Sequence, residues 1–177
     1  APVATGTDGA SRLLCVAAVT PRKGQDLLVE ALATLTDARW TCLLTGPLRR
    51  APEFVADLRR RLRRYGLTGR VRLTGPRTGD RLSRTYAAAD LLVLPSRAET
   101  YGMVVTEALA RGIPVLATAV DAVPETLGRS GDGARPGLLV PPEDPAALAG
   151  ALRDWLARPA LRERLRAAAR DRRTALP

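Results

Sequence analysis

The chain has 177 residues, a formal net charge of +10, two cysteines and no histidine. This length suits one domain, and the sequence shows neither a membrane-spanning apolar run nor a charged-then-apolar signal segment. Without histidine, a Ser-His-Asp triad and a histidine-based zinc site are excluded. Cys15 and Cys42 lie inside apolar runs, which is typical of core thiols in a protein of the reducing cytoplasm.

In chain order, the small and polar residues 1–10 predict a linker or disordered segment, and residues 11–177 predict one domain. Strands are predicted at 13–19, 40–45, 71–74, 91–94, 114–117 and 138–140. Helices are predicted at 24–36, 52–65, 79–89, 103–111, 124–127, 145–157 and 159–172. Apolar strands without polar alternation, each followed by a helix, are typical of a parallel sheet covered on both faces. We therefore predict an α/β, Rossmann-like three-layer domain with a parallel sheet of about six strands.

The positive charge is concentrated in residues 49–84, which contain three acidic residues and twelve arginines. The arginines are at positions 49, 50, 59, 60, 61, 63, 64, 70, 72, 77, 81 and 84. Such a segment can attract an anionic partner, but it is equally compatible with a solvated, arginine-rich face of the predicted helix 52–65. Of the 28 basic residues only Lys23 is a lysine, which indicates a place where a compact ammonium is needed.

Two kinds of loop follow the early predicted strands. Thr20-Pro21-Arg22-Lys23-Gly24 leads from the first strand toward a helix, and two cations there favour a phosphate site, although an ordinary helix start fits as well. Gly46-Pro47 and Gly75-Pro76 end two further strands at the sheet edge where ligands bind, or form simple tight turns. Neither G-x-G-x-x-G after the first strand nor a P-loop motif is present, which argues against a dinucleotide dehydrogenase or a P-loop nucleotidase.

The segment from Leu94 to Glu107 is the second candidate for a ligand site. It places Glu99 in a loop after a strand, Gly102 at a helix start and Glu107 more than one turn inside that helix. Carboxylates there can accept hydrogen bonds from sugar hydroxyls, and the free N–H groups near Gly102 suit a diphosphate. The alternative is that Glu99 is a loop charge and Glu107 pairs with Arg111 four residues on.

The run from Leu92 to Val115 resembles the signature of retaining glycosyltransferases of family 4, in which two glutamates are separated by seven residues and the second begins E-A-x-A-x-G-x-P-V. The similarity extends from Leu14 to Leu156. The further matching positions are Arg22-Lys23-Gly24, Gly46, Gly75, Ala89-Asp90, Pro124-Glu125 and Gly137 to Pro141. The resemblance implies the carboxyl-terminal, nucleotide-sugar-binding domain of a GT-B enzyme, whose amino-terminal half would supply the acceptor site.

The same resemblance assigns roles to residues of this chain. Glu99 and Lys23 would be the catalytic residues, with Glu99 on the donor sugar and Lys23 on the diphosphate of a nucleotide-diphosphate-sugar donor. The implied donor-binding residues are Arg22, Lys23, Gly46, Pro76, Arg77, Glu99, Gly102, Met103, Val104 and Glu107. The implied reaction is hexosyl transfer with retention of anomeric configuration, without a protein nucleophile, a cofactor or a metal ion, and the isolated domain would be inactive.

Two positions depart from the family pattern. Ala17-Ala18 stand where Gly-Arg is usual, and Asp121-Ala122 stand where Gly-Gly is frequent. These changes bear on donor affinity more than on the fold, and a catalytically impaired nucleotide-binding domain is one alternative function. A nucleic-acid-binding module is another, but no aromatic residues interleave with the arginines as a base-stacking platform requires. A third alternative is an enzyme held peripherally, by its arginine-rich helix, at the anionic inner face of a membrane.

Overall fold

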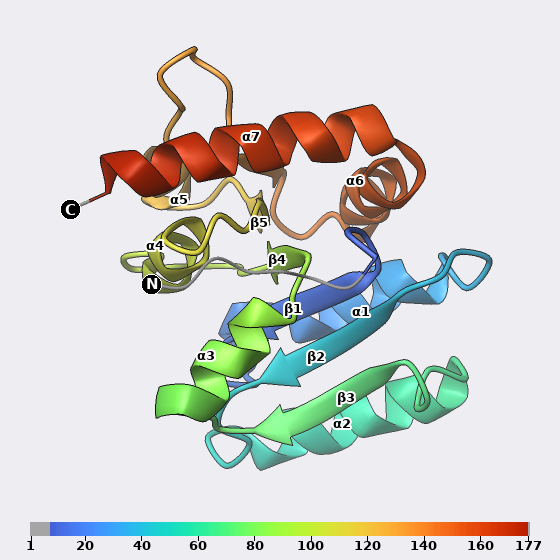
Figure 1. Cartoon of the computed structure of the whole chain (residues 1–177). Helices are drawn as coiled ribbons and strands as arrows, with labels where there is room; N and C mark the ends of the chain where they lie inside the picture. Colours follow the sequence, from blue (N-terminus) through green and yellow to red (C-terminus); the bar gives the residue numbers. More distant parts are fainter. Residues whose placement is uncertain (1–7, 177) are drawn as a thin grey trace.

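A six-stranded parallel sheet forms the centre of the molecule in the computed structural model, which describes residues 8–176 (Figure 1). The strands are β1 (Arg12–Val16), β2 (Thr41–Thr45), β3 (Val71–Gly75), β4 (Leu91–Leu94), β5 (Val115–Thr118) and β6 (Gly137–Val140). Each strand pairs in parallel with its neighbours. The predicted α/β class and the parallel sheet are confirmed.

Helices connect the strands and close the chain, as the sequence pattern predicts. They are the short 3₁₀ helix η1 (Pro21–Lys23), α1 (Gln25–Ala33), α2 (Pro52–Arg64), α3 (Gly79–Ala87), α4 (Met103–Leu109), α5 (Val123–Leu127), α6 (Pro145–Ala157) and α7 (Pro159–Ala175). Several of these helices have proline in their first turn. Proline is tolerated there because the N–H groups of the first turn have no partner within the helix, so no hydrogen bond is lost.

The strand order is β3-β2-β1-β4-β5-β6. The chain first builds the sheet outward from β1 to β3, and then crosses back to place β4 on the other side of β1. The connections after β1 and β4 therefore leave the sheet in opposite directions. Between their carboxyl ends lies the crevice in which open α/β sheets bind ligands.

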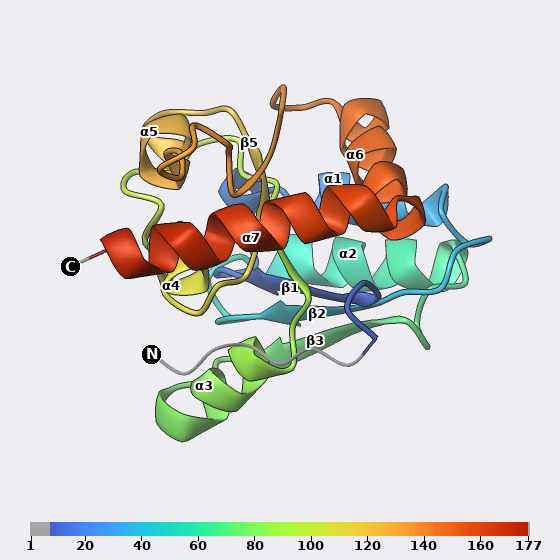
Figure 2. The same cartoon turned by 45° about the horizontal axis from the view of Figure 1, so that its top comes forward.

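Alternate residues of the strands pack into two apolar clusters, one on each face of the sheet. One cluster includes buried residues of α1, α2 and α6, the other includes buried residues of α3, α4 and α5, and α7 contributes to both. Figures 1 and 2 show α3 on the face of the sheet opposite α1 and α2, with α7 lying across α4 and α6. Because the helices cover the two faces of the sheet, a ligand site is expected at the edge formed by the carboxyl ends of the strands.

Cys15 and Cys42 lie on the same face of the sheet, and each is almost completely buried. Burial raises the pKa of Cys15 to about 12 and raises that of Cys42 as well, because a thiolate would lose its hydration. The predicted core thiols are confirmed: both cysteines are free and pack in the apolar cluster.

The predicted boundaries differ most around the first connection. The first strand ends at Val16 rather than residue 19. Beyond it, Ala17 donates a hydrogen bond to the carbonyl of Thr45 at the end of β2, and Val19 donates to the carbonyl of Pro47 in the loop after β2. The predicted helix 24–36 is observed as α1 (Gln25–Ala33), and the separate turn η1 precedes it. Gly24, whose φ of +71° is left-handed, separates the two because it interrupts helical geometry. Lys23 therefore lies in a separate turn before α1.

The first described residues are tied to the domain by hydrogen bonds. Residues 1–7 of the predicted linker lie outside the described residues. The adjoining residues are held in place, since Trp155 donates a hydrogen bond to the carbonyl of Ala10 and the Asp8 carboxylate accepts from the N–H groups of Ala10 and Ser11. Across residues 8–176, none of the helices has both the length and the apolarity that a membrane span requires.

Candidate functional site

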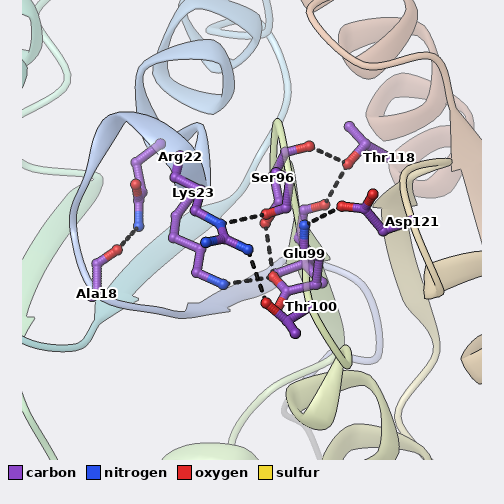
Figure 3. Close-up of polar contacts among 11 residues, drawn as sticks. Ala18, Arg22, Lys23, Ser96, Glu99, Thr100, Thr118 and Asp121 are labelled. Atoms are coloured by element: carbon purple, nitrogen blue, oxygen red, sulfur yellow. Dashed lines mark hydrogen bonds and ion pairs between the residues drawn. The ribbon is translucent and has the colours of Figure 1, made fainter.

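The loops after β1 and β4 meet at the point where the strand order reverses. There the Lys23 ammonium donates a hydrogen bond to Glu99 Oε2 at 2.6 Å, and the two side chains are 22% and 10% exposed (Figure 3). Ser96 Oγ also donates to Glu99 Oε2, at 3.2 Å. An ammonium carries three protons, so one bond to Glu99 leaves Lys23 able to bind an anion at the same time.

Gly24 allows the turn that carries Lys23 to lie directly against the other loop. A Cβ atom at this position would be 2.0 Å from the carbonyl oxygen of Pro95. No side chain fits at that distance, so the close approach of the two loops depends on glycine. The Arg22-Lys23-Gly24 segment thus packs directly against the loop after β4, in addition to preceding a helix.

Two arginines fasten the Glu99 loop to the opposite side of the crevice. Arg22 donates from Nη2 to Thr100 Oγ1 at 2.9 Å, so its guanidinium is directed to the loop. Arg97 forms a two-pronged ion pair with Asp26 of α1, at 2.9 and 2.8 Å, and also contacts Glu143 at 3.0 Å. Burial alone would raise the pKa of Asp26, but the hydrogen bonds and charge of Arg97 outweigh it and lower the pKa.

Beside this pair, a pocket of about 310 Å³ opens at the carboxyl ends of the first three strands. Its lining includes four of the predicted donor-binding residues, namely Gly46, Pro76, Arg77 and Val104. Ala17 and Ala18, the residues that replace the usual Gly-Arg, line the same pocket. Gly46 is required here, because a Cβ atom would be 2.0 Å from the carbonyl oxygen of Ala17.

Arg77 contributes to this pocket with its guanidinium turned toward α3. Its Nη1 donates to Thr85 Oγ1 at 2.8 Å, while its Nε is buried without a hydrogen-bond partner. Burial and the neighbouring charges of Arg81 and Arg72 lower the pKa of Arg77.

Glu107 lies on α4, one turn beyond Val104, and its carboxylate is held by a residue that sequence analysis missed. Tyr86 of α3 donates its hydroxyl hydrogen to Glu107 Oε2 at 2.7 Å. The alternative pairing with Arg111 is not formed, since Arg111 donates to the backbone carbonyl of Glu107 and stacks over the Tyr86 ring. Burial, and then the hydrogen bond with Glu107, raise the pKa of Tyr86.

The remaining predicted residues, Gly102 and Met103, form the start of α4. Gly102 has a left-handed φ of +61°, and Met103 is 67% exposed. Within residues 8–176, the structure contains no group of three or more cysteine, aspartate or glutamate side chains placed to hold a metal ion.

Sequence reasoning also missed Asp121 as a partner of Glu99, although it marked Asp121 as a departure from the family pattern. The Glu99 N–H donates to Asp121 Oδ2 at 2.7 Å. Tyr86 offered a weaker signal, as one of only six aromatic residues in the chain. Neither contact is local in sequence, so neither could be read from spacing.

The doubly wound sheet defines a Rossmann-like domain, and the paired lysine and glutamate at its switch point mark a candidate polar site at its carboxyl edge. The chain belongs to the glycosyl transferases group 1 family, whose model matches residues 5–172.

One relative, a D-inositol 3-phosphate glycosyltransferase of Streptomyces avermitilis, is 38% identical over 160 residues, which cover 86% of this chain and 34% of that protein. The match thus spans about a third of the length of such curated relatives.

Solved structures agree with this membership. Anabaena HepE in complex with UDP-glucose matches with a TM-score of 0.82 and 26% identity, over 94% of this chain and 44% of that one. The carboxyl-terminal domain of a group 1 glycosyl transferase from Francisella tularensis matches with a TM-score of 0.81 and 24% identity, over 93% of this chain and 85% of that one. The fold is therefore that of the second domain of a GT-B glycosyltransferase.

Proposed function

We propose that this chain is the donor-binding part of a glycosyltransferase that moves a hexose from a nucleotide-diphosphate sugar to an acceptor with retention of anomeric configuration. The observation that supports this most is the ion pair between Lys23 and Glu99 at the switch point, beside a pocket whose lining includes the predicted donor-binding residues Gly46, Pro76, Arg77 and Val104. The binding of UDP and UDP-glucose by the solved HepE structures supports a nucleotide-sugar ligand.

The chemistry divides the site into two parts. Lys23 would neutralise charge on the diphosphate, and Glu99 would accept hydrogen bonds from hydroxyls of the donor sugar. One ammonium bonded to both Glu99 and the diphosphate would keep the sugar and its leaving group aligned, with the positive charge fixed before the reaction. As the bond from the sugar to the diphosphate breaks, the acceptor oxygen would attack from the same face of the sugar.

The pocket beside this pair would hold the nucleoside. Gly46, Pro76 and Arg77 would approach the base, and the backbone of Gly102, Met103 and Val104 would face the phosphates. Glu107 would accept hydrogen bonds from the ribose hydroxyls through the oxygen that Tyr86 leaves free. Charge on the diphosphate would be balanced by Lys23 and the start of α4, without a metal ion.

Calorimetric titration of the chain with UDP, GDP and ADP tests this proposal. We expect one of these nucleotides to bind. Lys23→Ala and Glu107→Ala should each lower the affinity for it by about tenfold or more, and EDTA should leave the affinity unchanged. Matched controls are Arg64→Ala and Glu163→Ala, which remove the same charges from exposed helix positions. If no nucleotide binds at millimolar concentration, or if the site variants bind as well as the controls, the proposed site is wrong.

The arginine-rich face of α2 supports a second role, attachment to an anionic membrane. Arg59, Arg63 and Arg64 are exposed, and no acidic partner is found for them among the described residues. Nucleic acid fits this face poorly, because Phe54 and Tyr65 of this region are partly buried against the core and offer no base-stacking platform.

Flotation with vesicles tests the membrane role. We expect the chain to float with phosphatidylglycerol vesicles at low salt and not with phosphatidylcholine vesicles, since each basic residue near an anionic surface contributes about 1 kcal/mol. Arg59→Glu with Arg63→Glu should abolish flotation, whereas Arg164→Glu with Arg170→Glu on α7 should not. Equal flotation of the two double variants would contradict a specific role for α2.

A further inference from the structure

Glu99 is held from two directions, and only one of them belongs to the predicted site. On the β1 side its carboxylate contacts Lys23. On the β5 side, Asp121 Oδ2 accepts a hydrogen bond from the backbone N–H of Glu99 at 2.7 Å, and Thr118 Oγ1 donates to the carbonyl of Ser96 at 2.5 Å. Figure 3 shows Asp121 and Thr118 on the opposite side of this loop from Lys23.

Asp121 adopts a left-handed backbone conformation, which is uncommon for residues other than glycine. Its φ is +48°, in the left-handed region that glycine enters freely and that most other residues avoid. Glycine is frequent here in the family pattern, so aspartate introduces strain where glycine would introduce none. What the aspartate adds is the acceptor for the Glu99 N–H, which glycine cannot supply.

The hydrogen bond from Glu99 to Asp121 should affect the position of the Glu99 carboxylate more than that of Lys23 or the neighbouring pocket. The Glu99 backbone determines where its carboxylate lies, and hence where a sugar hydroxyl would be met. The backbone of Lys23 belongs to a different segment, the turn before Gly24, which abuts the Pro95 carbonyl. The nucleotide pocket is lined by residues of other loops and does not include Glu99 or Asp121.

We propose that Asp121 is a positioning residue for Glu99, and that it sets how strongly the site distinguishes a nucleotide-diphosphate sugar from the bare nucleotide diphosphate. This inference rests on the proposed function of the site. Asp121 would act through the backbone of Glu99 and not by contact with the reacting atoms.

Three substitutions separate positioning from folding. Asp121→Asn keeps an oxygen acceptor and tolerates the left-handed conformation. Asp121→Gly removes the acceptor but relieves the backbone, so it should melt at a higher temperature than Asp121→Ala. Asp121→Ala removes the acceptor and keeps the strain, so it should melt at a lower temperature.

The first measurement needs no ligand. Amide hydrogen exchange by NMR should show a protected Glu99 N–H in the wild type and in Asp121→Asn, and faster exchange in Asp121→Gly and Asp121→Ala. Equal protection of the Glu99 amide in the wild type and Asp121→Gly would overturn the assigned hydrogen bond.

The second measurement compares the pairs UDP and UDP-glucose, GDP and GDP-mannose, and ADP and ADP-glucose by calorimetry. For the pair that the wild type binds, Asp121→Gly should lower the affinity for the sugar nucleotide by about fivefold to tenfold. It should lower the affinity for the bare nucleotide by less than about twofold. Asp121→Asn should keep the wild-type ratio. An unchanged ratio in Asp121→Gly overturns this inference alone, whereas a wild type that binds none of the six overturns the proposed function together with it.

Discussion

At the scale of single residues, the candidate site depends on Gly24 and Lys23. Lys23 is the only lysine of the chain, and its ammonium reaches Glu99 because Gly24 lets the turn approach the Pro95 carbonyl. A compact ammonium suits this place better than a guanidinium, because its three protons can serve two acceptors that are not coplanar. The conformation of one glycine thus determines the position of one charge.

Gly24→Ala should be much more destabilising than the same change at another left-handed glycine. Gly66 has nearly the same φ, +68° against +71°, but no atom lies within 4 Å of the Cβ position. We expect Gly66→Ala to lower the free energy of unfolding by about 1 kcal/mol, from backbone strain alone, and Gly24→Ala by about 3 kcal/mol or more.

Urea denaturation followed by circular dichroism measures both free energies of unfolding. Similar losses for the two variants would show that the loop after β4 moves away without cost, and that its close approach to Gly24 is not needed for the fold.

At the scale of elements, the loop between β4 and α4 is fastened to α1 and to the turn after β5. Arg97 provides the tie to α1 through Asp26, whose carboxylate is mostly buried. Because Arg97 lowers the pKa of Asp26 in the folded chain, this pair stabilises the fold above the ordinary aspartate pKa of 3.8. Its contribution is lost as the pH falls through that value toward the lower pKa of the folded chain.

Asp26→Asn should therefore lower the free energy of unfolding at pH 7 by about 1–3 kcal/mol, because the charge-assisted bonds to Arg97 are weakened. The difference between variant and wild type should shrink as the pH is lowered from 5 to 2. Asp37→Asn is the matched control, since Asp37 pairs with Arg153 at an exposed site where screening leaves little net effect.

Urea denaturation of the wild type and both variants at several pH values between 7 and 2 measures these free energies of unfolding. A stability difference between Asp26→Asn and the wild type that stays constant from pH 7 to pH 2 would contradict the role of this pair.

At the scale of the whole molecule, the chain is one Rossmann-like domain with its candidate site at the carboxyl edge of the sheet, whereas its relatives are about two and a half times as long. In the proposed function the acceptor is held by a part of the enzyme outside this domain. The isolated chain should then bind a donor without transferring its sugar, because proximity of the two substrates supplies much of the rate.

We expect no release of nucleotide above background when the chain is incubated with a sugar nucleotide that it binds, with or without D-inositol 3-phosphate as a trial acceptor. A coupled assay for the free nucleoside diphosphate measures this release. Turnover that disappears in Glu99→Gln would show instead that the domain carries a complete active site.

The sequence alone was sufficient for much of the fold and for part of the site. Apolar runs such as Leu91–Leu94 need no partner to be recognised as buried strands, and the helical spacing of Leu58 and Leu62 predicts their inward face. The two glutamates and the lone lysine could also be found, because motif spacing and residue counts are properties of the chain itself.

Tertiary structure decided which of these residues meet. Lys23 and Glu99 are 76 positions apart, and Asp121 is a further 22 from Glu99. Tyr86 reaches Glu107 only because α3 and α4 cover the same face of the sheet. Periodicity records whether a side chain is buried, but contacts between distant segments depend on strand order and on how the crossovers pack, which no local pattern contains.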